Sequence, residues 1–66
     1  MNVTVEVVGE GSRDVDADAD ATYADLVRAV GLNVNEVSVL VDGSPVPEDQ
    51  PVEADQITVL RLIQGG

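Results

Sequence analysis

The spacing of the apolar residues changes twice along this chain, and these changes constrain its fold more than any other feature. Residues 3–7 alternate valine with polar residues, as in a strand with one buried face. Residues 23–30 place apolar side chains at helical spacing. Alternation returns in residues 36–41 and 56–63. With 66 residues and no cysteine, the chain must build one small core from a helix and a sheet.

The aspartate-rich segment 13–20 predicts a second strand. Aspartate occupies alternate positions, so Val15, Ala17 and Ala19 are expected to face inward. A row of carboxylates on the outer side discourages pairing with another molecule, which places this strand at an edge of the sheet.

Turn signals delimit the remaining strands. Residues 36–41 form the third predicted strand, and Asp42-Gly43 is typical of a type I′ hairpin turn. Residues 44–46 form a short fourth strand, which Pro45 confines to the other edge. The first and fifth strands carry the least charge and are expected at the centre, because a strand with neighbours on both sides tolerates few charges.

The predicted helix, residues 23–30, has a signal at each end. Thr22 and Asp25 resemble a capping box, and Gly31 suits the left-handed position that follows a helix. Tyr23, the sole aromatic residue, is expected to pack in the core. The order is therefore ββαββ: an α+β, ubiquitin-like β-grasp fold, with a mixed sheet and one helix packed on one face.

The charge excludes several classes of function. Thirteen acidic residues against three basic ones give a net charge of −10, whereas nucleic acids and anionic membranes bind cationic surfaces. No segment reaches the roughly 18 apolar residues of a membrane span, and no signal peptide is recognisable, so we expect a cytoplasmic protein. The absence of lysine, with carboxylates on every segment, indicates a halophile, where salt screens their repulsion.

The side chains needed for catalysis are missing. The chain has no histidine, cysteine or lysine, which removes the usual general base, zinc ligand and nucleophiles. We therefore expect a protein that is not an enzyme and holds no bound cofactor.

A calcium site is the alternative interpretation of the aspartate-rich segment. Asp14, Asp16 and Asp18 have the spacing that opens an EF-hand loop, and Asp25 stands at its twelfth position. However, Ala19 occupies the place where that loop needs glycine. Alternation on an edge strand explains the spacing without a metal, so we predict no metal site and at most loose cation association.

The last two residues, Gly65-Gly66, follow the fifth predicted strand with only Gln64 between them. Glycine lacks a Cβ and costs the most entropy to order, so the pair does not stabilise a fold. A narrow end tipped with a carboxylate can enter the slot of an activating enzyme, although an ordinary frayed terminus is the alternative. We expect a domain of residues 1–63 followed by a tail of residues 64–66.

The whole chain resembles the small archaeal modifier proteins of halophiles, in particular their short ubiquitin-like member that ends in a di-glycine. The resemblance rests on four segments: MNVTVEVVGE, TYADLVRAV, VSVLVDG-PVPEDQ and VLRLI-GG. The chain is more distantly similar to ubiquitin-related modifier, to the small subunit of molybdopterin synthase and to the thiamin sulfur carrier.

The resemblance implies a function at Gly66. An E1-like activating enzyme would use ATP to adenylate its carboxylate, with Ile63, Gln64 and Gly65 recognised as part of the tail. The acyl group would then form an isopeptide bond with a lysine of a target protein. Alternatively it would become a thiocarboxylate that supplies sulfur to tRNA-thiolation or other sulfur-transfer enzymes. An isopeptidase or metalloprotease would remove the conjugated modifier.

Two departures from ubiquitin bear on this expectation. Without lysine, the chain cannot form lysine-linked polymers of itself. Arg61 and Leu62 are also out of step with the basic positions of the ubiquitin tail, so we expect a dedicated archaeal activating enzyme. Arg61 either steadies the tail, contacts an acidic partner or serves as a simple surface residue.

Alternation along the predicted strands places four apolar side chains on the sheet face away from the helix: Val8, Leu40, Leu60 and Leu62. We expect them to form a partner-binding patch near the tail, since contiguous exposed apolar surface tends to mark a binding site. The alternatives are a different strand register that buries them, or scattered exposure. Two rival functions follow: a non-conjugated β-grasp interaction domain with an inert tail, and an acidic inhibitor or adaptor that binds through the patch.

The charge leads to a first testable prediction. At about 1 M salt the Debye length is roughly 3 Å, so repulsion among the carboxylates is screened, whereas at millimolar salt it acts across the whole domain. We expect the domain to lose secondary structure when the salt is removed, measured by circular dichroism. Unchanged spectra between molar and millimolar salt would contradict this expectation.

Overall fold

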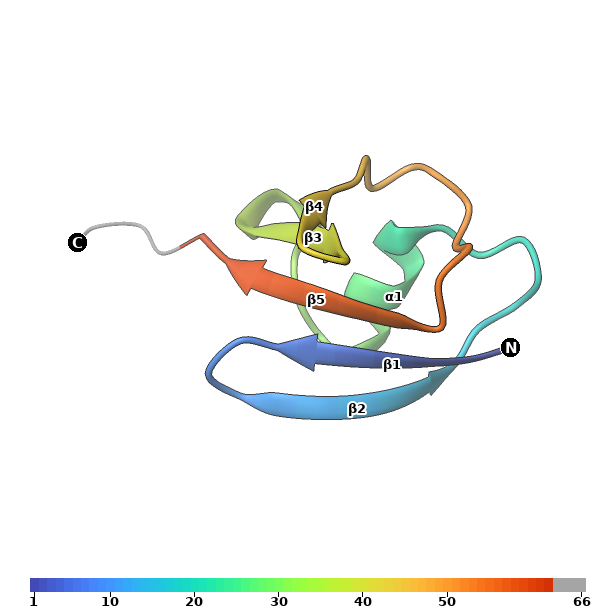
Figure 1. Cartoon of the computed structure of the whole chain (residues 1–66), viewed down its shortest axis with the longest axis horizontal. Coiled ribbons are helices and arrows are strands. Elements are labelled where there is room, and N and C mark those ends of the chain that lie inside the picture. Colours follow the sequence, from blue (N-terminus) through green and yellow to red (C-terminus); the bar gives the residue numbers. More distant parts are fainter. Residues whose placement is uncertain (63–66) are drawn as a thin grey trace.

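A computed structural model describes residues 1–62 of the chain. These residues form a mixed sheet with one α-helix packed on one face, which is the ubiquitin-like β-grasp fold (Figure 1). The elements in chain order are β1 (Asn2–Val7), β2 (Gly11–Asp16), α1 (Tyr23–Ala29), the 3₁₀ turn η1 (Val34–Glu36), β3 (Val37–Val41), β4 (Ser44–Pro45) and β5 (Gln56–Arg61).

The strand order confirms the placement predicted from charge and proline content. It runs β2-β1-β5-β3-β4, so the aspartate-rich strand and the proline-bearing strand lie at the two edges. β5 lies in the middle, parallel to β1 and antiparallel to β3. The hairpin between β3 and β4 turns at Asp42-Gly43, where both residues have the positive φ of a type I′ turn (52° and 81°).

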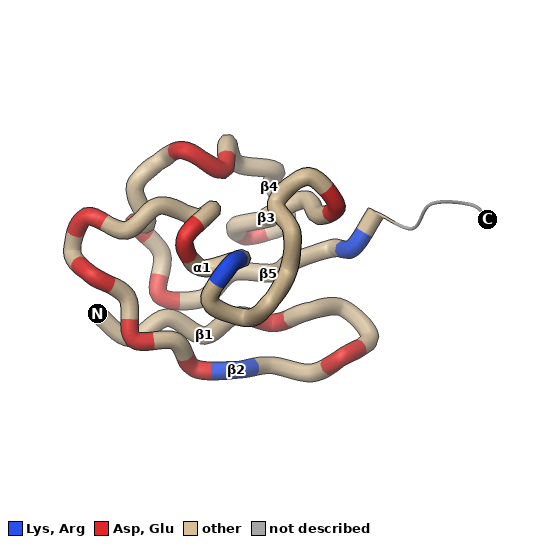
Figure 2. Tube along the Cα trace, turned by 180° about the vertical axis from the view of Figure 1, so that it is seen from behind, with Lys and Arg blue, Asp and Glu red and all other residues tan. Residues whose placement is uncertain are grey.

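The core lies between the sheet and the helix. β1 contributes three alternating valines, α1 contributes Leu26 and Val27, and β5 contributes Ile57 and Val59. Tyr23 is buried as predicted, and its hydroxyl accepts a hydrogen bond from the Glu53 amide at 3.3 Å. No polar or charged side chain is buried among residues 1–62. The aspartates and glutamates lie on the surface of β1, β2, α1 and the connecting segments (Figure 2), whereas β3, β4 and β5 contain none.

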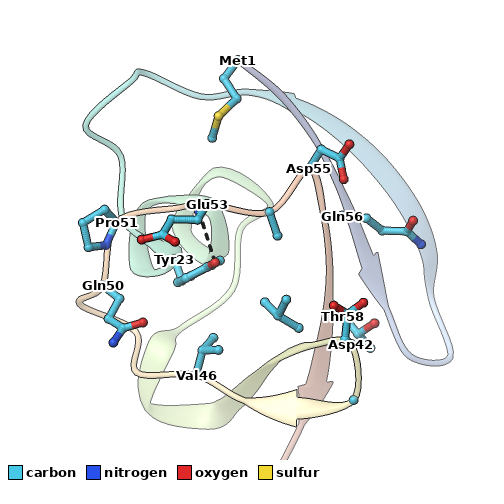
Figure 3. A pocket seen from close by; sticks show the side chains of 13 residues that line it. Met1, Tyr23, Asp42, Val46, Gln50, Pro51, Glu53, Asp55, Gln56 and Thr58 are labelled. Atoms are coloured by element: carbon cyan, nitrogen blue, oxygen red, sulfur yellow. Dashed lines mark hydrogen bonds between the residues drawn. The ribbon is translucent and has the colours of Figure 1, made fainter.

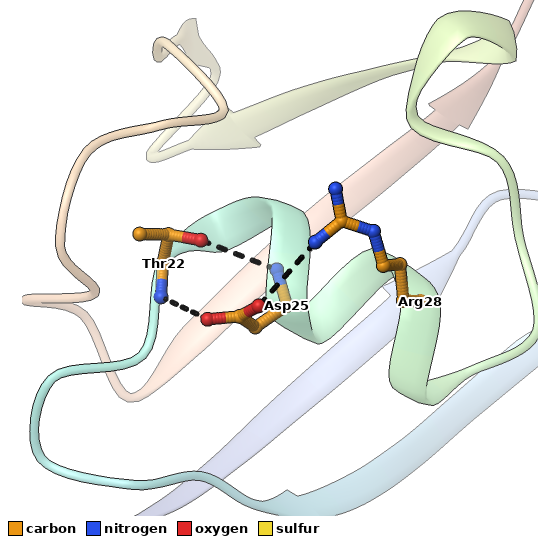
Figure 4. A network of polar contacts seen from close by, with 3 residues as sticks. All are labelled: Thr22, Asp25 and Arg28. Carbon is orange, nitrogen blue, oxygen red and sulfur yellow. Dashed lines mark hydrogen bonds and ion pairs between the residues drawn. The ribbon is translucent and has the colours of Figure 1, made fainter.

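A capping box starts the helix, as the sequence predicted (Figure 4). The Asp25 amide donates to the Thr22 hydroxyl at 3.3 Å, and the Thr22 amide donates to the Asp25 carboxylate at 2.9 Å. The hydrogen bond from the Thr22 backbone is the main cause that lowers the pKa of Asp25, and Arg28 adds to it. Gly31 follows the helix with a φ of +82°, the left-handed conformation expected there.

Several predicted boundaries were wrong. β2 begins two residues early, at Gly11, whereas α1 ends at Ala29, β4 at Pro45 and β5 at Arg61. β2 ends at Asp16 rather than Asp20, and Ala19 is exposed rather than inward-facing. The Ala21 amide donates to the Asp18 carbonyl at 3.0 Å, which closes a turn where the alternating pattern suggested a strand. The third strand starts one residue later than predicted, because Glu36 belongs to the 3₁₀ turn η1.

The capping box leads to a second prediction. Replacing Thr22 by alanine removes the acceptor of the Asp25 amide, and losing such a cap costs about 1 kcal/mol of the free energy of unfolding. Chemical denaturation in high salt, followed by circular dichroism, measures this loss. Thr22→Ser keeps the hydroxyl and should retain most of the stability. Equal destabilisation by both substitutions would show that the hydroxyl is not what matters.

Candidate functional site

The end of β5 is held by segments from three other parts of the chain. Pairing with β3 continues to the last residue of the strand, where Arg61 lies opposite Val37. One residue further, the Leu62 amide donates to the Glu36 carbonyl at 2.7 Å. On the other side of the strand, the Val8 amide donates to the Val59 carbonyl at 3.0 Å. The described chain therefore leaves the sheet at a defined point.

An ion pair joins Arg61 to the turn between β1 and β2. The Arg61 guanidinium donates a hydrogen bond to the Glu10 carboxylate, and each side chain remains about half exposed. This hydrogen bond and the charge of Glu10 raise the pKa of Arg61, with a smaller contribution from Glu36. This contact with a carboxylate of its own domain was not among the roles predicted for Arg61.

Apolar side chains surround this point on the sheet face that the helix leaves uncovered. Val8, Leu60 and Leu62 are 48%, 40% and 48% exposed. They line a hollow of about 480 Å³ together with Gly9, Glu10, Glu36 and Arg61. We call Val8, Leu60 and Leu62 the tail-root patch. The hollow combines an apolar surface with acidic groups at its border, so it suits an apolar partner side chain rather than an anion.

Leu40 lies apart from the tail-root patch. It is half-buried, does not line the hollow, and sits opposite Thr58 on β5 and Pro45 on β4. Ser38, not Leu40, is the residue of β3 opposite Leu60. Of the four residues expected in one patch, the structure therefore brings three together and places Leu40 on the same face, diagonally across from Leu60.

Nothing in the sequence singled out Glu10 as the partner of Arg61. It is 51 positions away from Arg61, and no local pattern links a turn after the first strand with the end of the fifth. The parallel pairing of β1 and β5 carries the turn to that end of the sheet. This contact could be predicted only from the topology, because the β-grasp strand order places the loop after the first strand beside the end of the last strand.

The residues predicted to act in the tail, Ile63, Gln64, Gly65 and Gly66, lie outside the described residues. Arg61 and Leu62 are the last described positions before them. The geometry of the site therefore concerns the root of the tail rather than the reacting group.

Two of the candidate calcium ligands, Asp14 and Asp25, make other contacts. The Asp14 carboxylate accepts a hydrogen bond from the Thr4 hydroxyl at 3.0 Å, and Asp25 belongs to the capping box. Between residues 1 and 62, no three histidine, cysteine, aspartate or glutamate side chains are grouped as metal ligands.

A wider hollow, of about 850 Å³, lies at the opposite end of β5 (Figure 3). Gln56 and Thr58 border it from the strand, and Tyr23 and Val46 contribute apolar surface. Because this hollow surrounds the start of β5, it lies away from the tail root.

In the described range 1–62, no helix is long and apolar enough to cross a membrane.

Comparison with known proteins gives consistent matches. The family model "Small archaeal modifier protein 2" matches residues 1–63. Small archaeal modifier protein 2 of Haloferax volcanii is 70% identical over 66 residues, and the match covers all of both chains. An uncharacterized protein of Archaeoglobus fulgidus is 30% identical over 67 residues, again over all of both chains.

Solved structures agree with the fold. The crystal structure of small archaeal modifier protein 2 from Haloferax volcanii matches with a TM-score of 0.77 and 69% identity, covering 97% of each chain. The crystal structure of SAMP1 from the same organism matches with a TM-score of 0.74 over all of both chains. At 19% identity, this second likeness shows the fold alone.

Proposed function

Because this chain belongs to the family of small archaeal modifier protein 2, whose members are ubiquitin-like modifiers and not enzymes, we propose that it acts through the carboxylate of Gly66. In this proposal an E1-like enzyme activates the carboxylate in the cytoplasm. The acyl group is then joined to lysines of target proteins, and it also serves as a thiocarboxylate sulfur carrier for tRNA thiolation.

The observation that supports this proposal most is the central position of β5. The strand that precedes the tail pairs on both sides, and its inward residues Ile57 and Val59 are fully buried. The domain thus presents the root of its tail at a fixed place, while the sequence beyond it ends in two residues without a Cβ. Such a tail fits a narrow enzyme slot.

The chemistry requires nothing further from this chain. The Gly66 carboxylate attacks the α-phosphate of ATP, and pyrophosphate leaves. A lysine amine of the target then attacks the acyl carbon, and AMP leaves as the isopeptide bond forms. When sulfide attacks in place of the amine, AMP leaves and the product is the thiocarboxylate. When a persulfide of a sulfur-transfer enzyme attacks, the product is an acyl disulfide, and a thiol of that enzyme then cleaves its S–S bond, which releases the thiocarboxylate and leaves a disulfide. The modifier serves as substrate and carrier, consistent with its lack of histidine, cysteine and lysine.

The tail leads to a third prediction. A chain that lacks Gly65 and Gly66 should form neither conjugates nor thiocarboxylate, because its carboxylate then lies on Gln64, two residues short of the reacting position and next to a side chain. Affinity capture from cells followed by mass spectrometry would detect a glycine remnant on target lysines and the replacement of oxygen by sulfur at Gly66. Asp49→Asn, in an exposed turn that does not line the hollow at the tail root, is the control and should behave as the unmodified chain. Unaltered conjugates after the deletion would leave a non-conjugated adaptor as the better account.

We also propose that the tail-root patch docks the activating enzyme. Its side chains are exposed and adjacent, and they border the strand that delivers the tail. Burying a leucine side chain in an interface contributes on the order of 1.5–3 kcal/mol, so one such contact can change the affinity of the enzyme substantially.

The patch leads to a fourth prediction. Leu60→Glu should lower kcat/KM for activation roughly tenfold or more, because it replaces an apolar contact by a charge. Leu40→Glu should have a smaller effect, since Leu40 does not line the hollow. Pro45→Glu, at the far edge of the same sheet face, is the matched control. Normal activation of both leucine variants, with folding unchanged by circular dichroism, would rule the patch out as a docking site.

A further inference from the structure

The free edge of β2 is a surface that the proposed modifier chemistry does not use. β2 is the outermost strand on its side, and β1 is its neighbour in the sheet (Figure 1). Hydrogen-bonding groups on the far side of such a strand are available to a further strand. Whether the edge accepts a strand depends on which backbone groups point outward and on what surrounds them.

The register identifies the outward groups. The Ala17 amide donates to the Met1 carbonyl at 2.7 Å, and the Met1 amino group donates to the Ala17 carbonyl at 2.9 Å. In an antiparallel ladder, hydrogen-bonded pairs recur at every second residue, so Val15 and Arg13 also point their backbone groups toward β1. The residues of β2 whose amides and carbonyls point away from the sheet are therefore Ser12, Asp14 and Asp16.

A groove runs between the end of this strand and the helix, on the helix side of the sheet. Its volume is about 330 Å³. Five small or apolar residues line it, Val15, Ala17, Ala21, Leu26 and Ala29, together with the aspartates Asp16, Asp18 and Asp25. A strand added to the edge of β2 would place every second side chain over this groove. Apolar side chains of that strand would pack against Val15, Ala17 and Leu26. Arg13 lies further along the same face of β2 and disfavours a cation beside it.

The other face of the edge is anionic. Asp14 and Asp16 direct their side chains to the face without the helix: Asp14 contacts Thr4, and the Asp16 side chain is 96% exposed. Alternate side chains of an added strand would lie beside these carboxylates, and opposite charges stabilise such neighbours. A second copy of this chain would bring its own aspartates to the same place and be repelled.

We propose that the edge of β2 binds an extended segment of a partner protein in which basic and apolar residues alternate. The segment pairs with the outward backbone groups of β2, places its basic side chains beside Asp14 and Asp16, and lays its apolar side chains over the groove against α1. This surface is on the far side of β1 from β5, so a partner bound there leaves the root of the tail open. The inference does not depend on the function of Gly66.

The fifth prediction tests this surface with a peptide of alternating valine and arginine long enough to span β2. The peptide is titrated into the isotopically labelled full chain, at a salt concentration that keeps the domain folded, and amide exchange is followed by NMR. Binding should slow exchange about tenfold or more at the amides of Ser12, Asp14 and Asp16. The amides of Arg13 and Val15 should change little, since they already bond to β1.

Two controls separate strand pairing from simple charge attraction. A peptide with the same residues arranged as one valine block and one arginine block should bind at least about tenfold more weakly, because it cannot alternate its faces. The double substitution Asp14→Asn and Asp16→Asn should weaken binding of the alternating peptide about fivefold to tenfold. Glu48→Gln with Asp49→Asn removes equal charge elsewhere and should change the affinity less than about twofold.

Three results would overturn the proposal. The first is equal binding of the two peptides. The second is slowed exchange at the tail root, or spread evenly over the surface, instead of the alternating pattern on β2. The third is unchanged affinity after the substitutions at Asp14 and Asp16 in a chain that circular dichroism shows to be folded. Each result bears on this edge alone, because activation at Gly66 is measured separately.

Discussion

The parallel pairing of β5 with β1 in the middle of the sheet is the constraint on which the rest of the structure depends. It places Val5 beside Ile57 and Val7 beside Val59, and all four side chains are buried against the helix. Each buried aliphatic side chain contributes about 1.5–3 kcal/mol. A slip by one residue would turn β5's inward side chains to the opposite face. The core therefore determines where β5 ends, and with it the point from which the tail emerges.

The contacts around the end of β5 fix the direction in which the chain leaves the sheet more than they add to the stability of the fold. Arg61 pairs with Glu10 at the surface, where an ion pair contributes little to the free energy of unfolding. Together with the bond from Leu62 to the Glu36 carbonyl, it ties the end of β5 to the first hairpin and to the turn before β3. These links leave Leu60 and Leu62 exposed beside Val8. The domain thus combines a fixed exit with an apolar surface next to it.

Much of this arrangement could be predicted from the sequence, because its signals are local. Alternating aliphatic residues identified the buried faces of β1, β3 and β5, and Thr22 with Asp25 identified the helix start. The end of β2 was predicted wrongly, since alternating aspartates are compatible with both a strand and the turn that Asp18 forms. The tail-root patch was predicted from the alternation of side chains between the two faces of the sheet. Leu40 was assigned to it as well, because alternation gives the face on which a side chain lies but not which residue of the neighbouring strand lies opposite. The Glu10 contact needed the three-dimensional topology.

In this account the fold supplies the position of the tail, and the chemistry belongs to the carboxylate of Gly66. The most direct measurement is the exchange of labelled pyrophosphate into ATP by the E1-like enzyme. It compares the intact chain with the same chain carrying a C-terminal amide. We expect exchange with the carboxylate form and none with the amide, because only the carboxylate can attack the α-phosphate. Equal exchange with both forms, or none with the intact chain, would contradict the account.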